Sequence, residues 1–128
     1  MKEEMKILVG VDGSDTSTWA LMEAISIAKK FSGTIKVITV YKRGYVDSAT
    51  KIQIKVKQLL DGEEIESSFG SILGSNPARA LVDIAKNENF NLIVVGSRGL
   101  TNAAAFFIGS VSKKVVSKAS CDVLIVKK

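Results

Sequence analysis

Short apolar runs alternate along the chain with longer segments in which apolar residues recur at helical spacing. The runs predict five strands, at residues 6–11, 34–41, 64–73, 91–96 and 122–128. Strands that are apolar along almost their whole length are typical of a parallel sheet with helices on both faces. Because crossovers between parallel strands are right-handed, the pattern predicts one doubly wound α/β domain over residues 1–128.

Capping residues and apolar faces mark where the helices lie. The expected buried face of the first helix carries Leu21, Ile25 and Ala28. Its candidate N-caps are Asp15, Thr16 and Ser17, and Gly33 is a natural stop. A later helix is expected to begin with Asn76 as N-cap and Pro77 in its first position. The apolar positions of the last helix are Val111, Val115, Val116 and Ala119.

Residues 42–62 carry two overlapping patterns. Strict alternation over residues 51–57 fits a strand, whereas Ile52, Val56, Leu59 and Leu60 also fit one face of a helix. The spacing between the flanking strands favours the helix. Gly70 is expected to weaken the third strand or to introduce a bulge there.

Composition narrows the possible functions. The chain has no histidine, which removes the commonest general base and metal ligand, and its one cysteine, Cys121, excludes an internal disulfide and a CxxC metal site. The net charge of +5 raises the question of nucleic acid, but the eight aromatic residues are not interleaved with basic ones, so a generally basic surface is favoured. No apolar run is long enough to span a membrane, and no signal peptide is evident, so we expect a cytoplasmic protein.

The loop before the last helix holds three glycines, Gly96, Gly99 and Gly109, and Ser110 follows the third. Glycine lets backbone N–H groups approach phosphate oxygens, and a helix that begins near Ser110 would direct its free N–H groups and its dipole toward an anion. No acidic residue occurs between residues 97 and 121. The pattern therefore indicates a phosphate-binding loop, and the alternative is a tight turn that allows close helix packing.

Asp12 lies at the end of the first strand and has two interpretations. Its carboxylate could accept the hydroxyls of a ribose, or it could be an ordinary acid at the start of a helix. Neither GxxxxGK[ST] nor GxGxxG occurs in the chain, which excludes a P-loop and argues against a Rossmann dinucleotide site.

The spacing Gly-x2-Gly-x9-Gly-Ser resembles the nucleotide loop of the ATP-binding universal stress proteins. The similarity extends to "ILVGVDGS" at the first strand, to "NPARALVDIAKNENFNLIVVGSRG" before the loop, and to "VSKKVVSKASCDVLIVKK" after it. Residues 42–62 depart from the family pattern, because they are shorter and more basic than expected.

The resemblance implies a five-stranded parallel sheet of order 3-2-1-4-5. It also implies ATP bound together with Mg²⁺ or Mn²⁺, and a homodimer joined through the last strand, residues 122–127. The implied contacts are Asp12 with ribose, Val11 and Val40 with adenine, and the backbone of Gly96 and Gly99 with the phosphates. The Gly109–Ser110 turn would also hold phosphates, with help from Ser112, whereas Arg98 occupies a variable position.

The residues themselves also predict a dimer. The segment "VLIV" is apolar on both faces and belongs to a strand at the expected sheet edge, where an uncovered strand invites pairing with a second chain. The alternative is that a helix or loop covers this edge.

These observations favour a nucleotide-binding module of the stress response over a dedicated enzyme. The predicted site offers no catalytic base, so any ATPase activity should be slow. A second hypothesis is a dimeric interaction protein that binds no nucleotide, and a third, an adenylating enzyme, lacks candidate reactive residues. The loop would hold ADP or AMP in the same way as ATP, but less tightly.

Overall fold

The computed structural model describes residues 4–97 and 110–127. In this part of the chain the strands form one parallel sheet of order β3-β2-β1-β4-β5, as predicted. The strands are β1 (Lys6–Gly10), β2 (Thr34–Tyr41), β3 (Ser67–Leu73), β4 (Leu92–Gly96) and β5 (Asp122–Val126). The helices are α1 (Asp15–Phe31), α2 (Val46–Leu60), α3 (Pro77–Asn87) and α4 (Ser110–Lys118).

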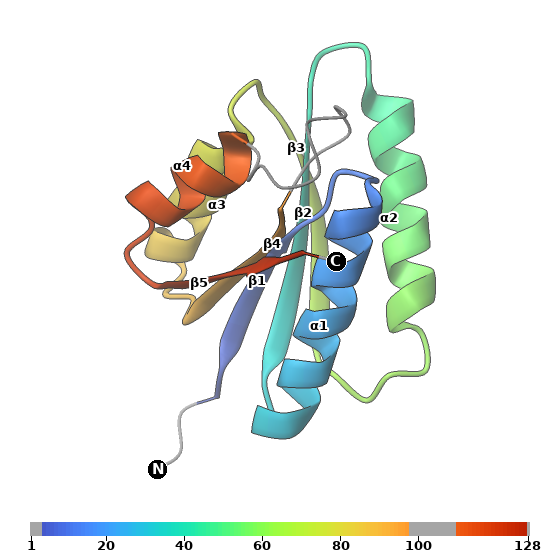
Figure 1. Ribbon diagram of the computed structural model, residues 1–128. Coiled ribbons are helices and arrows are strands. Elements are labelled where there is room, and N and C mark those ends of the chain that lie inside the picture. The colour runs from blue at the N-terminus through green and yellow to red at the C-terminus, as the bar shows by residue number, and fades with distance from the viewer. Residues whose placement is uncertain (1–3, 98–109, 128) are drawn as a thin grey trace.

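Helices cover both faces of the sheet (Figure 1). Helices α1 and α2 pack on one face, and α3 and α4 pack on the other. Side chains alternate between the two resulting cores, so that Ile7 and Val9 of β1 point toward α1 while Leu8 points toward α3 and α4. All three are fully buried, which explains why a central strand reads as a continuous apolar run.

The beginning of α1 differs from the prediction. Ser14 is the N-cap, and its side chain accepts a hydrogen bond from the N–H of Ser17, whereas Asp15, Thr16 and Ser17 belong to the helix itself. Four consecutive residues can cap a helix here, and the turn through Gly13, with a φ of +88°, selects the first of them. The predicted stop is confirmed in position, because the N–H of Gly33 donates to the carbonyl of Ala28.

The segment with two patterns contains a helix, as the strand spacing favoured. Helix α2 buries Ala49, Gln53, Val56 and Leu60 against β2 and β3. Strand β3 begins at residue 67 rather than 64, and its register with β2 runs without interruption through the pair Ile38 and Gly70. The predicted bulge is therefore wrong.

Helix α3 begins as predicted, with the Asn76 side chain accepting from the N–H of Arg79 and with Pro77 in the first helical position. In α4 the expected apolar face is only partly buried, because Val115 is fully buried and Val116 is exposed. None of the helices in residues 4–97 and 110–127 is both long enough and apolar enough to cross a membrane.

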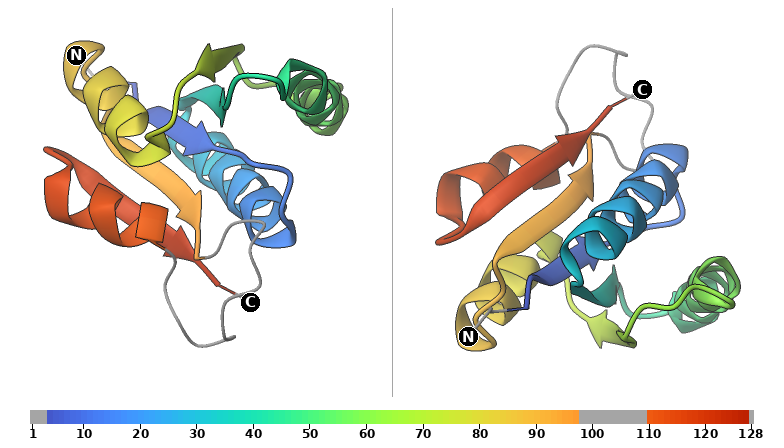
Figure 2. Two further views of the ribbon diagram at one scale, coloured as in Figure 1. Left: turned by 90° about the horizontal axis from the view of Figure 1, so that it is seen from above. Right: turned by 90° about the horizontal axis from the view of Figure 1, so that it is seen from below.

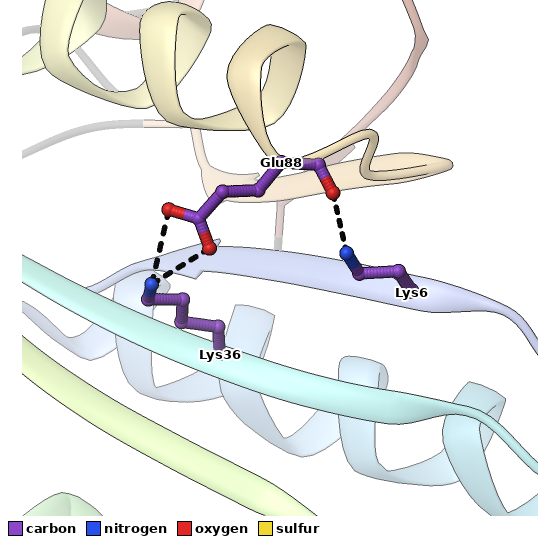
Figure 3. Close-up of polar contacts among 3 residues, drawn as sticks. All are labelled: Lys6, Lys36 and Glu88. Atoms are coloured by element: carbon purple, nitrogen blue, oxygen red, sulfur yellow. Dashed lines mark hydrogen bonds and ion pairs between the residues drawn. The ribbon is translucent and has the colours of Figure 1, made fainter.

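A polar cluster of Lys6, Lys36 and Glu88 lies near the amino ends of β1 and β2 (Figure 3). The Nζ atom of Lys36 on β2 lies 2.9 and 3.1 Å from the two carboxylate oxygens of Glu88, which follows α3 directly. Lys6 on β1 donates to the backbone carbonyl of Glu88, and its ammonium lies 4.8 Å from the centre of the Phe90 ring. Two basic side chains thus hold the end of α3 against two strands.

Candidate functional site

The candidate site lies at the other end of the strands, where β1 and β4 reach their carboxyl ends (Figure 2, left). These two strands are neighbours, although the chain passes from β1 to β2 on one side before it reaches β4 on the other. Such a reversal of strand order leaves a crevice beyond the carboxyl ends of the strands, where ligands bind in open α/β sheets. Helix α1 begins just after β1, and α4 is the next described element after β4.

Asp12 is fixed by the turn between β1 and α1. Its Oδ1 atom accepts a hydrogen bond of 2.9 Å from the N–H of Ser14, and its own N–H lies 3.3 Å from Oγ of Ser17. Asp12 therefore acts as an acid at a helix start, one of its two predicted roles. Its other oxygen, Oδ2, makes no hydrogen bond with any residue among 4–97 and 110–127, which leaves it able to accept a hydroxyl.

Gly96, the last residue of β4, packs directly against the first turn of α1. A Cβ atom at this position would lie 2.6 Å from the carbonyl carbon and from Oγ1 of Thr16, and 2.8 Å from the N atom of Ser17. Backbone atoms cannot yield as the end of a side chain can, so any larger residue would force α1 and β4 apart. The predicted alternative, close helix packing, accounts for Gly96 without a ligand.

Ser112 links α4 to the end of β4. Its side chain is 2% exposed, and its Oγ donates to the carbonyl of Gly96 at 2.6 Å. Ser110, two residues earlier, is exposed in the first turn of α4, which contains no acidic residue. The hydroxyl proton of Ser112 is thus committed to the protein backbone, whereas Ser110 is exposed.

The two valines predicted to contact adenine lie at the ends of neighbouring strands. Val11, which follows β1, is 6% exposed and packs in the core beneath α1. Val40, near the end of β2, is half-buried and packs on the face that carries α3 and α4. The other predicted residues, Gly99 and Gly109, lie outside the described residues, as does Arg98, to which the resemblance gives no role.

The single cysteine lies away from this crevice, at the start of β5. Partial burial raises the pKa of the Cys121 thiol, and the negative charge of neighbouring Asp122 raises it further. A raised pKa keeps the thiol protonated and poorly nucleophilic near neutral pH. Cys121 therefore contributes no reactive group to the site.

Residues 5–127 match the Universal stress protein family. The chain belongs to this family. Among its relatives, the universal stress protein YxiE of Bacillus subtilis is 29% identical over 148 residues, which cover 95% of this chain and 98% of YxiE.

Solved universal stress protein structures share the fold. A universal stress protein crystallised in complex with cAMP is 26% identical, with a TM-score of 0.76 and coverage of 95% of this chain and 96% of its own. The universal stress protein from Archaeoglobus fulgidus in complex with dAMP is 21% identical, with a TM-score of 0.78 and coverage of 99% and 100%.

Sequence reasoning missed the structural role of three residues around the ends of β1 and β4 in this universal stress protein. Thr16 and Ser17 are buried in the first turn of α1 and form the surface against which Gly96 packs. Ser97 is also buried, and its N–H donates to the carbonyl of Val126 on β5 at 2.9 Å. The run of hydroxyl residues at positions 14, 16, 17 and 18 was the available signal, but Thr16 and Ser17 also fit the role of helix caps, which hides their packing role.

Proposed function

We propose that this universal stress protein binds an adenine nucleotide, ATP with Mg²⁺ or Mn²⁺, in the crevice between the ends of β1 and β4. The observation that carries the proposal is the convergence of Asp12, Gly96 and the first turn of α4 at one reversal of strand order. A carboxylate oxygen with free accepting capacity suits a ribose hydroxyl, and a helix start without acidic residues suits phosphate. The cAMP complex of a 26% identical universal stress protein supports the same ligand class.

In this proposal each candidate residue has a distinct role. Asp12 accepts the ribose hydroxyls, while Val11 and Val40 supply apolar contacts to adenine. The backbone of Gly96 and Gly99 and the turn at residues 109–110 hold the phosphates. Because the Ser112 hydroxyl already donates to the Gly96 carbonyl, its contribution is to keep the start of α4 in place beside the phosphates.

In this proposal the divalent cation would be held mainly by the phosphates of ATP and not by a cluster of protein side chains. Among residues 4–97 and 110–127, no group of three or more Asp, Glu, Cys or His side chains is arranged to hold a metal ion. A cation bridging phosphate oxygens needs few protein ligands. When bound, it would neutralise phosphate charge alongside the helix dipole and the backbone N–H groups.

We also propose that the protein acts as a cytoplasmic homodimer joined through β5. This strand is at an edge of the sheet and pairs within the described chain only with β4. Its side chains from Val123 to Val126 are half-buried on both faces, so pairing with a second copy would cover apolar surface and satisfy backbone groups. Sedimentation equilibrium should give twice the chain mass of 13.7 kDa, and a monomer at all concentrations would refute the dimer.

The nucleotide proposal is tested by calorimetric titration of nucleotide-stripped protein with ATP and Mg²⁺. GTP serves as the base control, and ADP, AMP and cAMP measure the contribution of each phosphate. A Gly109→Val variant should lose ATP binding while its circular dichroism spectrum is retained, and a Ser117→Ala variant, on the exposed side of α4, should bind normally. No heat and no thermal stabilisation with millimolar ATP would overturn the proposal in favour of a dimeric interaction protein without a nucleotide.

A further inference from the structure

A groove of about 450 Å³ runs between α3 and α4, the two helices that cover one face of the sheet (Figure 1). Ala78 and Val82 of α3 provide its apolar lining, and Asn76 lies at its edge. None of the groove residues is among those assigned to the nucleotide. The volume is within the range of about 300 to 1,000 Å³ that is typical of small-molecule sites.

The charges around this groove are unbalanced. Arg79 from α3 and both Lys114 and Lys118 from α4 line it, together with a single carboxylate, that of Asp83. Arg79 and Asp83 form only a loose ion pair, with 3.7 Å between Nε and Oδ2 and with both side chains exposed. The groove therefore carries an excess of positive charge.

The two lysines have no counter-ion within the described chain. Across residues 4–97 and 110–127, no carboxylate pairs with Lys114 or Lys118. They lie four residues apart on one face of α4, about 6 Å along the helix axis, an arrangement in which like charges destabilise a helix. An anion bound between them would remove this repulsion and would also face Arg79.

We propose that the α3–α4 groove binds a small polyvalent anion, a metabolite with two or more phosphate or carboxylate groups. The ammonium groups of Lys114 and Lys118 act as point charges for two anionic groups, and the Arg79 guanidinium can donate to an oxygen from the opposite wall. Ala78 and Val82 contact the carbon skeleton. A bound anion would add a polar bridge between two helices that already pack against each other through apolar side chains.

The test follows backbone amide shifts of ¹⁵N-labelled protein during titration with tripolyphosphate and, separately, with citrate. Saturable shifts at residues 76–83 and 113–119 are expected with at least one anion. A response to tripolyphosphate alone means that the groove selects phosphate groups, and a response to citrate alone means that it selects carboxylates. A response to both means that it recognises negative charge without selecting between the two groups. Tripolyphosphate bound at the nucleotide crevice would instead shift residues near Ser97 and Ser110.

A Lys114→Glu/Lys118→Glu variant should weaken the groove titration by about a hundredfold, about tenfold for each reversed charge, and leave ATP binding intact. Lys86→Glu/Lys113→Glu is the matched control, since these exposed lysines lie on the same two helices but outside the groove, and it should change the affinity less than threefold. Equal loss in both variants, or no saturable groove shifts with either anion, would overturn the proposal. Groove shifts with a poly-glutamate peptide but with neither small anion would likewise refute it and indicate a protein-docking surface.

Discussion

The two ends of the sheet use polar side chains in different ways. At the amino ends, the Lys36 ammonium pairs with the Glu88 carboxylate, and Lys6 donates to the backbone carbonyl of the same residue. At the carboxyl ends of β1 and β4, the side chains of Asp12 and Ser112 hydrogen-bond to backbone groups, without an ion pair among the described residues. The first arrangement holds a helix end to two strands. The second fixes the chain at the ends of β1 and β4 and leaves the Asp12 Oδ2 atom available to a ligand.

This difference indicates where substitutions should affect stability and where they should affect binding. Paired surface charges contribute little free energy, because water and salt already screen them. Buried contacts with the backbone contribute more, because a lost hydrogen bond or a steric clash cannot be relieved by solvent. The carboxyl end should therefore be sensitive in both stability and ligand affinity, and the amino end should be weakly sensitive in stability alone.

The largest effect is expected from Gly96→Ala. Its added methyl would overlap backbone atoms of Thr16 and Ser17 at 2.6 to 2.8 Å and push α1 away from β4. Overpacking of this kind costs about 1 to 3 kcal/mol, and the rigid neighbours place this site at the upper end. Urea denaturation measures the loss in the absence of nucleotide.

Gly74→Ala is the matched control for this substitution. A Cβ atom there would meet only Val40 Cγ1, at an ordinary contact distance of 3.7 Å, so the free energy of unfolding should change by less than about 0.5 kcal/mol. If Gly96→Ala weakened ATP binding but left the free energy of unfolding at the wild-type value, Gly96 would serve the ligand and the packing explanation would be wrong.

Ser112→Ala should have the next largest effect. It removes the buried hydroxyl that donates to Gly96 and leaves that carbonyl without this partner, at a cost of about 1 to 2 kcal/mol. ATP affinity should fall as well, because the first turn of α4 loses its attachment to β4. Ser117→Ala on the exposed side of the same helix is the control and should be nearly neutral in both measurements. Unchanged stability for Ser112→Ala would contradict the importance of this link.

The sequence was sufficient for most of the fold and for only part of the site. Apolar runs and the Asn76–Pro77 helix start depend on neighbours close in the chain, so the doubly wound α/β class and the start of α3 were predicted correctly from the residues. The order of the strands was implied by the family resemblance, and it is confirmed. The N-cap of α1 was missed because four adjacent residues can cap, and the turn at Gly13 decides among them. The packing role of Gly96 depends on Thr16, eighty residues earlier, which glycine spacing cannot reveal.

Asp12→Asn should separate the two functions of this side chain. The asparagine keeps an amide oxygen for the N–H of Ser14, so the free energy of unfolding should change by less than about 0.5 kcal/mol. Its NH₂ group replaces the oxygen proposed to accept ribose hydroxyls, and ATP affinity should fall about tenfold, as for the loss of one charge-assisted hydrogen bond. Asp12→Ala should reduce both stability and affinity. Wild-type ATP affinity in Asp12→Asn, measured by calorimetry, would remove the ribose role.

The smallest effect is expected at the amino end of the sheet. Glu88→Gln removes the charge that Lys36 contacts but keeps the backbone carbonyl to which Lys6 donates. The Lys36 and Glu88 side chains are 27% and 42% exposed, so the loss should be about 0.3 to 1 kcal/mol and should shrink in 1 M salt. ATP affinity should stay at the wild-type value, since the substitution lies at the amino ends of the strands and the proposed nucleotide site lies at their carboxyl ends. The control is Asp83→Asn, which breaks a looser and more exposed pair and should cost still less. A loss above about 2 kcal/mol, or one insensitive to salt, would mean that the Glu88 cluster is as important to the fold as the buried contacts at the carboxyl end.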